Sequence, residues 1–391
     1  MNNEHDQNEL SVITAVLPES NADEVAEQAI VANGLSALSW KARTTLLRTN
    51  WLSRWMPPVT PVRSVMQMIV PTPAAKPTLA SLIRSARLHQ QVTGAVFSTP
   101  CARSFVGSKF VGWSEKSLSA PHELASIAKP MTAIFCVVGP DLSDHVARAA
   151  VAAGAHGPVI SIAEGRGLRD RIGWLRITKE HRQDVQLVLA EHSVAGGVFN
   201  AMARAGQFDK PGRGLIYSIP VDAGVFNLAS EYASTKQTAS LQQIIDAIDS
   251  LAGHSHWREH EGAIQSIASP TYLGSGHASD MPERQCLTAV VRHAQAHDLN
   301  ELILDCGASG MNTTQAHLVS ASEDEHVGDA RIHEEYALIR SVVSPDVGEQ
   351  LFSVLEQGAE ELGFEDVCVA TNPIDHLVAY VPGKKDYRSV A

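Results

Sequence analysis

Lys210, Gly212, Arg213 and Gly214 have the types and the spacing of a phosphate-binding turn. Successive backbone N–H groups around two glycines can form a concavity that binds an anion. Lys210 and Arg213 add positive charge, and an arginine can hold a phosphate through two N–H groups at once. The alternative is a plain type II turn, with Pro211 and Gly212 at its central positions because glycine tolerates a positive φ. The residues by themselves leave both interpretations open.

A second group of residues combines arginine with tryptophan in the segment KARTTLLRTNWLSRWMPPVTP, at residues 41–61. Its basic and aromatic members are Lys41, Arg43, Arg48, Trp51, Arg54 and Trp55. Leu47, Trp51 and Trp55 recur every four residues, which would place them on one face of a helix. Tryptophan and arginine are enriched at the centres of protein interfaces, so these arginines and tryptophans are predicted to bind a protein partner. The alternatives are a helix packed on its own domain and a basic face at a membrane surface.

Three histidines lie close together in the segment GHSHWREHEG, at residues 253–262. In a helix, His256 and His260 would share a face with the i,i+4 spacing that can bind zinc. A polar linker is the simpler interpretation, because neither an HExxH pattern nor a nearby cysteine accompanies His254, His256 and His260. A metal-dependent enzyme is therefore kept as an alternative function.

The composition favours a cytoplasmic protein with aliphatic cores. Of the 391 residues, 44% are hydrophobic and only 5% are aromatic. The formal net charge of −12 argues against general nucleic-acid binding. The polar, acidic opening residues do not resemble a signal peptide, and no apolar run reaches the ~18 residues that a membrane span needs. The five scattered cysteines form no CxxC pair and predict reduced thiols.

One order of landmarks occurs three times along the chain. Each copy has a threonine in a β-rich apolar run, a glycine that ends a helical stretch and a proline that ends a closing strand. They are Thr14, Gly34 and Pro100; Thr132, Gly154 and Pro220; and Thr288, Gly307 and Pro382. Each copy is expected to run strand, helix, strand, strand, helix, strand. This pattern predicts an α+β chain of three ferredoxin-like units, each with two helices on one face of an antiparallel sheet.

The three units are expected at residues 11–110, 131–228 and 285–384, with a helical and loop linker at residues 229–284. Ser20 is expected to cap the first helix. In the second unit, a strand at residues 171–179 is expected to precede a helix at residues 180–205. Counting back from the closing prolines aligns Gly214 with Gly94 and His376, Arg213 with Thr93 and Asp375, and Gly212 with Val92 and Ile374. By this alignment only the second unit keeps Gly-x-Gly.

Several stretches resemble PII-type nitrogen regulatory proteins and their PII-like relatives. In the second unit these are GAHGPVISIAEGRGLRDRIG, at residues 154–173, and DKPGRGLIYSIPV, at residues 209–221. In the third unit the stretch is GASGMNTTQAHLVS, at residues 307–320, whereas the first unit is similar only in its order of elements and in TGAVFSTP. Such proteins are trimers of ferredoxin-like subunits that bind nucleotides in the clefts between subunits. The resemblance therefore implies a covalent pseudo-trimer.

The resemblance also implies roles for individual residues. The family holds nucleotide phosphates with a Gly-Asp-Gly turn; here Arg213 replaces the aspartate and Leu215 stands where a basic residue is usual. Gly165-Arg166-Gly167 resembles the base of the family's long loop near the phosphates, and a glycine-rich connection between strands is the alternative. Asn312 falls where the family has a residue that contacts the base, and a polar residue that opens a strand is the alternative.

These observations predict a non-catalytic regulatory protein that senses an adenine nucleotide (ATP, ADP or AMP) or another small anion. Its partner is expected to be a protein, for example a membrane transport complex such as a bicarbonate uptake system. That partner would hold it at the inner membrane, and without a partner the chain is expected to be monomeric. The alternatives are a ligand-free structural adaptor and a metal-dependent enzyme that uses the histidine-rich linker.

Overall fold

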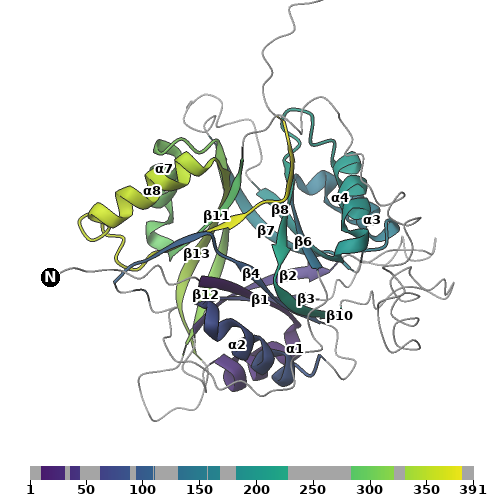
Figure 1. Cartoon of the computed structure of the whole chain (residues 1–391), viewed down its shortest axis with the longest axis horizontal. Coiled ribbons are helices and arrows are strands. Elements are labelled where there is room, and N and C mark those ends of the chain that lie inside the picture. Colours follow the sequence, from purple (N-terminus) through teal and green to yellow (C-terminus); the bar gives the residue numbers. More distant parts are fainter. Residues whose placement is uncertain are drawn as a thin grey trace, which may run out of the picture.

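The computed structural model describes residues 10–30, 36–44, 62–88, 94–108, 110, 131–155, 157–167, 182–227, 283–320 and 331–380. Within these residues the fold is α+β, as predicted, with six α-helices and a fifteen-stranded sheet. The strands lie at the centre of the molecule and the helices lie outside it in three pairs (Figure 1). Residues 10–106, 131–227 and 285–379 are called the first, second and third segments below.

Each segment contains two α-helices between its strands. The first has β1 (Leu10–Pro18), α1 (Glu19–Val25) continued by the short π-helix η1 (Ala26–Ile30), β2 (Ser36–Thr44), β3 (Val62–Pro71), α2 (Thr72–Ser85), β4 (Gly94–Pro100) and β5 (Arg103–Val106). The second has β6 (Met131–Val138), α3 (Pro140–Ala152), β7 (Val159–Gly167), β8 (Arg182–Glu191), α4 (His192–Gly206), β9 (Leu215–Val221) and β10 (Ala223–Asn227). The third has β11 (Gln285–Arg292), the 3-10 turn η7 (His293–Gln295), α7 (Ala296–Asp305), β12 (Gly310–Ser320), β13 (Arg331–Val343), α8 (Pro345–Gly358), β14 (Cys368–Pro373) and β15 (His376–Ala379).

The strands of each segment pair antiparallel in the same order. In the first segment the order is β4-β1-β3-β2, in the second β9-β6-β8-β7, and in the third β14-β11-β13-β12. In each segment, one face of its part of the sheet packs on the two helices of that segment. Helix α4 shows the pattern, because its buried Ala195, Val198, Phe199 and Met202 follow the helical period. The opposite faces pack on one another in a shared core that contains Trp40, Leu187 and Tyr336.

Two sets of strand pairs join the segments. The middle strands β2, β7 and β12 pair with one another. In addition, each short strand that follows a closing strand adds to another segment: β5 pairs with β14, β15 with β9, and β10 with β4. Every closing strand therefore has its outer edge covered by a strand from a different segment, which removes an edge that would otherwise be open to aggregation.

Two of the glycines that were predicted to end helices do so. Gly154 and Gly307 have φ of +98° and +103°, the left-handed conformation that glycine adopts at little cost. The next residue then donates back into the helix, from Ala155 to the Ala150 carbonyl at 3.0 Å and from Ala308 to the Ile303 carbonyl at 3.2 Å. Gly34 lies outside the described residues.

The predicted closing strand of the third segment is wrong. The strand that pairs with β11 is β14, whereas residues 376–379 form β15 and pair with β9 in the second segment. Pro100 lies opposite Ser11, Pro220 opposite Thr132, and Pro373 opposite Gln285. Pro373, not Pro382, is therefore the closing proline. The same register shows that Thr132 corresponds to Ser11 and not to Thr14.

This correction changes the alignment of the Gly-x-Gly turn. Counted back from Pro373, the third-segment counterparts of Gly212, Arg213 and Gly214 are Glu365, Asp366 and Val367. The first-segment counterparts, Val92, Thr93 and Gly94, stay as predicted, because Pro100 and Pro220 are equivalent in the sheet.

Two local predictions are also wrong. Residues 182–191 form strand β8, not the first part of a helix, because they pair with β6 along one edge and with β7 along the other. The helix begins only at His192. Ser20 does not cap α1, because it is already the second residue of the helix and its hydroxyl donates to Asn21. The strand expected at residues 171–179 and the helical linker at residues 229–284 lie almost wholly outside the described residues.

Candidate functional site

The turn before β9 has the geometry of a type II turn. The Arg213 N–H donates to the Lys210 carbonyl oxygen at 3.4 Å, and Gly212 has φ of +76°. Gly214 has φ of +101°, and a Cβ there would overlap the carbonyl oxygen of Val137 in β6. Gly94 approaches the corresponding carbonyl, since its Cβ would lie 2.9 Å from that of Val16. The close approach to β6 therefore explains why position 214 is a glycine. Gly212 is exposed, and only the conformation of the turn requires glycine there.

Two cations flank this turn. Lys210 is exposed, and its ammonium donates to the Gln207 side chain at 2.9 Å. Gln207 ends α4 in the left-handed conformation, with φ of +51°. Arg213 is half-buried, and no carboxylate among the described residues forms an ion pair with it. An anion at the N–H groups of Gly212 to Gly214 would therefore find an arginine whose charge is not already neutralised.

The structure brings Gly165-Arg166-Gly167 and Asn312 together across the second and third segments. In the pairing of β7 with β12, Gly165 lies opposite Asn312 and Gly167 lies opposite Gly310. Asn312 is 7% exposed, and its Oδ1 has no hydrogen-bond partner among the described residues. The Arg166 guanidinium lies 2.6 Å from Nδ1 of His297, which belongs to α7. These residues lie in different predicted units, so the sequence pattern alone did not place them side by side.

The pairing of β7 with β12 at Gly165 and Asn312 is called the junction below. The turn before β9 and this junction lie at the same end of the sheet. Gly214 packs on the last residues of β6, and Val138 there lies opposite Asp184 of β8. Asp184 in turn lies opposite Ile162 of β7, three residues before Gly165. From β6 to β12 there are three strand spacings, roughly 14 Å. An apolar floor of Val137, Ala163, Val185 and Leu215 connects the two sites.

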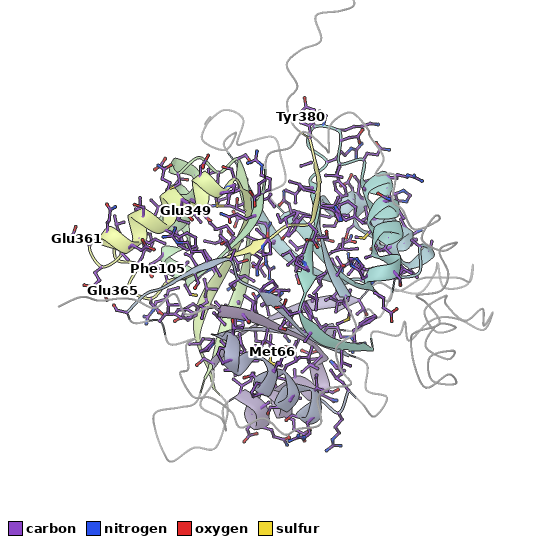
Figure 2. The ribbon with its side chains drawn as sticks, viewed as in Figure 1. Met66, Phe105, Glu349, Glu361, Glu365 and Tyr380 are labelled. Atoms are coloured by element: carbon purple, nitrogen blue, oxygen red, sulfur yellow. The ribbon has the colours of Figure 1, made fainter. Side chains whose placement is uncertain are left out.

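Strand β15 of the third segment covers the strand that follows the turn. Ala379 lies opposite Leu215, so Tyr380 follows beside Gly214. Tyr380 is 40% exposed and lies at the far end of β15, away from the core (Figure 2). At the other end of β15, burial lowers the pKa of His376 below its usual value, and the ring lies edge-on to Phe199.

Acidification is expected to loosen β15 from β9. The folded state favours neutral His376 because its pKa is lowered, so this contribution is fully present above the ordinary histidine pKa and is lost as the pH falls through the lowered value. The Ser218 carbonyl accepts from the Asp375 N–H at 3.0 Å, so the backbone of Ser218 faces β15. We expect the amide of Ser218 to exchange severalfold faster at pH 5 than at pH 7, after correction for intrinsic rates. His376→Gln should abolish this difference. An equal difference in His376→Gln would assign the effect to another group, such as Asp375 or His192.

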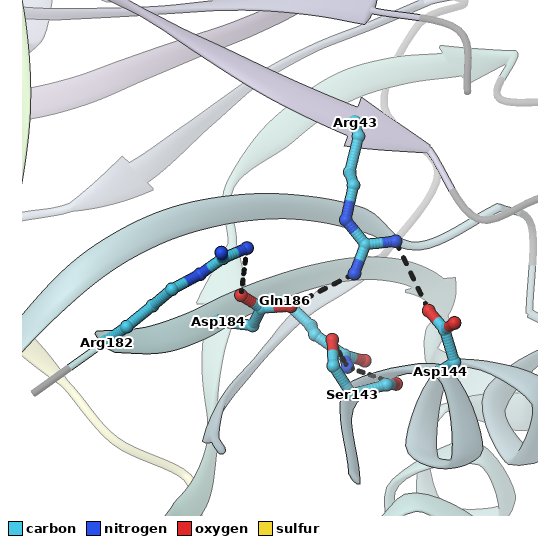
Figure 3. A network of polar contacts seen from close by, with 6 residues as sticks. All are labelled: Arg43, Ser143, Asp144, Arg182, Asp184 and Gln186. Atoms are coloured by element: carbon cyan, nitrogen blue, oxygen red, sulfur yellow. Dashed lines mark hydrogen bonds and ion pairs between the residues drawn. The ribbon is translucent and has the colours of Figure 1, made fainter. Parts of the chain in front are cut away.

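Arg43 forms ion pairs within the chain. From β2 in the first segment it contacts the second segment, with Nη2 3.0 Å from Asp184 and Nη1 3.2 Å from Asp144 on α3 (Figure 3). Asp184 is 1% exposed, and beside it Gln186 donates to the Ser143 carbonyl at 2.7 Å. The predicted partner-binding role of Arg43 stays a prediction, and the structure gives the residue an intramolecular role.

The other predicted partner-binding residues, Arg48, Trp51, Arg54 and Trp55, lie outside the described residues, as do the three histidines of residues 253–262. Lys41 is described, and it pairs with Glu19 at 2.5 Å on the surface. No cluster of three or more potential metal-ligating side chains occurs within the described ranges.

The equivalent turn of the third segment has the opposite charge. Asp366 takes the place of Arg213, and it is 5% exposed. Its Oδ2 accepts from Arg292 at 2.5 Å and from the Tyr336 hydroxyl at 2.7 Å. A buried carboxylate would repel a phosphate, so this turn is not a phosphate site. Residues 89–93 of the first segment lie outside the described part of the chain. Among the described residues, the turn of the second segment is therefore the candidate phosphate site.

None of the helices in the described ranges is long and apolar enough to cross a bilayer. Comparisons of the chain with protein-family models and with curated proteins find no match.

Proposed function

We propose that this chain is a non-catalytic regulatory protein of PII-like type, built as a covalent pseudo-trimer of ferredoxin-like units. The repeated strand order and the cyclic pairing of β5, β15 and β10 with closing strands of other segments support this proposal. A cyclic exchange of this kind is what three subunits related by a three-fold axis would make. Linking the units in one chain lets each junction change independently.

The proposed ligand is an adenine nucleotide, ATP, ADP or AMP, at the junction of the second and third segments. The observation that carries the proposal is the pairing of Gly165 with Asn312 at the end of the sheet that also holds the Gly-x-Gly turn. The N–H groups of Gly212 to Gly214, with Lys210 and Arg213, suit the phosphates. The apolar floor suits a flat ring, and Asn312 Oδ1 is an acceptor for its exocyclic amine.

In the proposed mechanism, ligand binding changes the order of the loops next to the junction and so changes the affinity for a protein partner. This coupling is reciprocal, so the bound partner raises the affinity for the nucleotide by the same factor. The arginines and tryptophans of residues 48–55 are the proposed contact, and a membrane transport complex, such as one for bicarbonate uptake, is the proposed partner. The protein would then act in the cytoplasm and lie at the inner membrane through that partner.

Calorimetric titration of the full chain with ATP, ADP and AMP tests the ligand. At least one nucleotide should bind, and Arg213→Ala should weaken it at least about tenfold, because a hydrogen bond to a charged group contributes ~1.5–3 kcal/mol and 1.4 kcal/mol is tenfold in affinity. Arg204→Ala, at an exposed arginine of α4, is the matched control and should bind like wild type. No heat with any of the three nucleotides, or equal losses in both variants, would contradict the proposal.

A ligand-free adaptor is the second candidate, and one observation favours it. Gly214 and Gly94 approach equivalent carbonyl oxygens, so the fold alone explains the second glycine of the turn. Capture of partners with the full chain and with residues 45–61 deleted, each with and without nucleotide, separates the two functions. A partner that depends on residues 45–61 but not on nucleotide supports the adaptor. A metal-dependent enzyme remains a prediction that metal analysis of untagged protein tests; zinc well below one ion per chain would exclude the zinc site.

A further inference from the structure

The short strands β5, β10 and β15 join the sheet in the same way. Each begins one or two residues after the closing strand of its own segment and pairs with the closing strand of another. The residue just before each strand donates its N–H to that closing strand: Ala102 to the Thr371 carbonyl at 2.7 Å, Asp222 to that of Ser98 at 2.9 Å and Asp375 to that of Ser218 at 3.0 Å. The first residues of the three strands, Arg103, Ala223 and His376, therefore occupy equivalent positions.

Arg103 attaches β5 to helix α8. Its guanidinium lies 4.7 Å from the ring centre of Phe352 and forms ion pairs with Glu349 and, at 2.7 Å, with Glu356. These four side chains are called the β5 clamp below. Because arginine is not deprotonated in proteins, the cation of the clamp is present at every pH at which the chain is folded.

His376 has the place of Arg103 in strand β15. Its ring lies edge-on to Phe199 of α4, with the ring centres 6.0 Å apart. Phe199 is the eighth residue of α4, as Phe352 is the eighth residue of α8. The second segment therefore repeats the aromatic half of the β5 clamp, with a histidine in place of the arginine.

The two carboxylates of the β5 clamp have no counterpart in the second segment. Counted from the start of each helix, Glu349 and Glu356 of α8 correspond to Gly196 and Ala203 of α4. Strand β15 is therefore attached at its first residue by an aromatic contact and by a ring whose charge changes near neutral pH.

The groups around His376 favour its neutral form. Burial lowers its pKa, Asp375 on the same strand opposes this, and His192 at the start of α4 lowers it further. The residues of β9, LIYSIPV, carry no acidic or basic side chain. Since the folded chain favours neutral His376, this contribution is complete above the ordinary histidine pKa and is lost as the pH falls through the lowered value.

Strand β15 covers the start of β9, next to the candidate turn. Leu215 lies between Ala379 of β15 and Val137 of β6, and Gly214 directly precedes it. Without β15 the start of β9 would keep its pairing with β6 alone. Short edge strands with few buried contacts are among the parts of a fold that open at low free energy. Release of β15 would therefore loosen the backbone that leads into the turn.

The end of β15 is packed less closely on its turn than the end of β5. Beyond β5, Gly107 is buried, its N–H donates to the Val367 carbonyl at 2.8 Å, and a Cβ there would overlap the Glu365 carbonyl oxygen. Val106 and Ala379 are equivalent in the pairing, so Tyr380 takes the place of Gly107 in the second segment. Tyr380 is 40% exposed.

We propose that β15 is a releasable strap on the candidate turn: attached to β9 it keeps the turn in the conformation that binds nucleotide, and its release lowers the affinity. The strap acts on the nucleotide site proposed above and therefore depends on that proposal. Acidification releases the strap by charging His376. The coupling is reciprocal, so bound nucleotide also favours the attached strap.

Amide exchange in the wild-type chain without nucleotide tests the release and needs no variant. The backbones of Ser218 and Thr371 face β15 and β5 respectively. The Ser218 amide should exchange severalfold faster at pH 5 than at pH 7, after correction for intrinsic rates, whereas the Thr371 amide should not. Equal responses of the two amides to pH would overturn the release of β15 and leave the nucleotide site standing.

Transfer of the β5 clamp to the second segment tests the role of His376. The triple variant His376→Arg, Gly196→Glu and Ala203→Glu should remove the pH response of the Ser218 amide. The matched control, Gly197→Glu with Arg204→Glu, adds carboxylates at neighbouring exposed positions of α4 and should keep it. A response that persists in the triple variant would contradict the role of His376.

Calorimetric titration with ATP, ADP and AMP at pH 7 and pH 5 tests the coupling. Acidification should weaken binding severalfold more in the wild type than in the triple variant. The phosphates of the nucleotide titrate alike in both experiments, so the difference between the chains measures the strap. Binding at pH 7 with equal pH responses in both chains would overturn the strap alone. Absence of binding at pH 7 would contradict the proposed function and the coupling together.

Discussion

Gly214→Ala is expected to destabilise the chain by roughly 2–5 kcal/mol. A left-handed backbone costs an L-residue about 1–2 kcal/mol, and overpacking adds about 1–3 kcal/mol. Both apply here, because Gly214 has φ of +101° and its Cβ would overlap the Val137 carbonyl oxygen. The end of β6 would have to move away from β9. Urea unfolding followed by circular dichroism measures the change.

Gly212→Ala is the matched control for this prediction. Gly212 also has a positive φ, +76°, but it lies exposed at the corner of the turn, so only the conformational cost of about 1–2 kcal/mol is expected. Equal losses in the two variants would show that the contact with Val137 is not what requires glycine at position 214. If nucleotide binds wild type, the folded Gly212→Ala variant also tests whether the turn's conformation matters for affinity.

Arg43→Met is expected to destabilise the chain by about 3 kcal/mol, the lower end of the usual cost of leaving a buried charge without its partner. Asp184 is 1% exposed, and without Arg43 its nearest cation is Arg182 at 3.9 Å. The destabilisation should be concentrated at the contact between the first and second segments, because Arg43 also lies opposite Ile160 in the pairing of β2 with β7. Chemical unfolding measures the total, and amide exchange at Ile160 measures the local change.

Two comparisons make this prediction specific. Asp144→Asn removes the other partner of Arg43, whose side chain is 58% exposed, and should cost less than about 1 kcal/mol. The double variant Arg43→Met with Asp184→Asn removes both charges and should be more stable than Arg43→Met alone. If Arg43→Met costs no more than Asp144→Asn, the buried ion pair is not important for stability.

Much of the local structure follows from the sequence. The alternation of strands and helices, the helix-ending conformation of Gly154 and Gly307, and the type II turn at Gly212 all depend on a few adjacent residues. Glycine at a left-handed position and proline at the start of a turn act through the backbone of their own neighbourhood. Such features do not need the rest of the chain.

The sequence-based predictions were wrong where two stretches of the chain fitted the same local pattern equally well. Residues 182–191 and residues 192–206 both contain several apolar residues, and only the position of β8 between β6 and β7 makes the first of them a strand. Pro373 and Pro382 both follow apolar runs, and only pairing with β11 identifies Pro373 as the end of the closing strand. Strand pairing is long-range, so local pattern could not decide it.

The residues of the candidate sites divide in the same way. By itself the sequence determined the Gly-x-Gly turn, its two cations and the class of fold, because these depend on residue type and short-range order. Only the tertiary structure placed Asn312 opposite Gly165 and Arg43 on Asp184. These positions depend on how the parts of the sheet from the three segments pack face to face, and that packing is fixed by contacts between residues far apart in the chain.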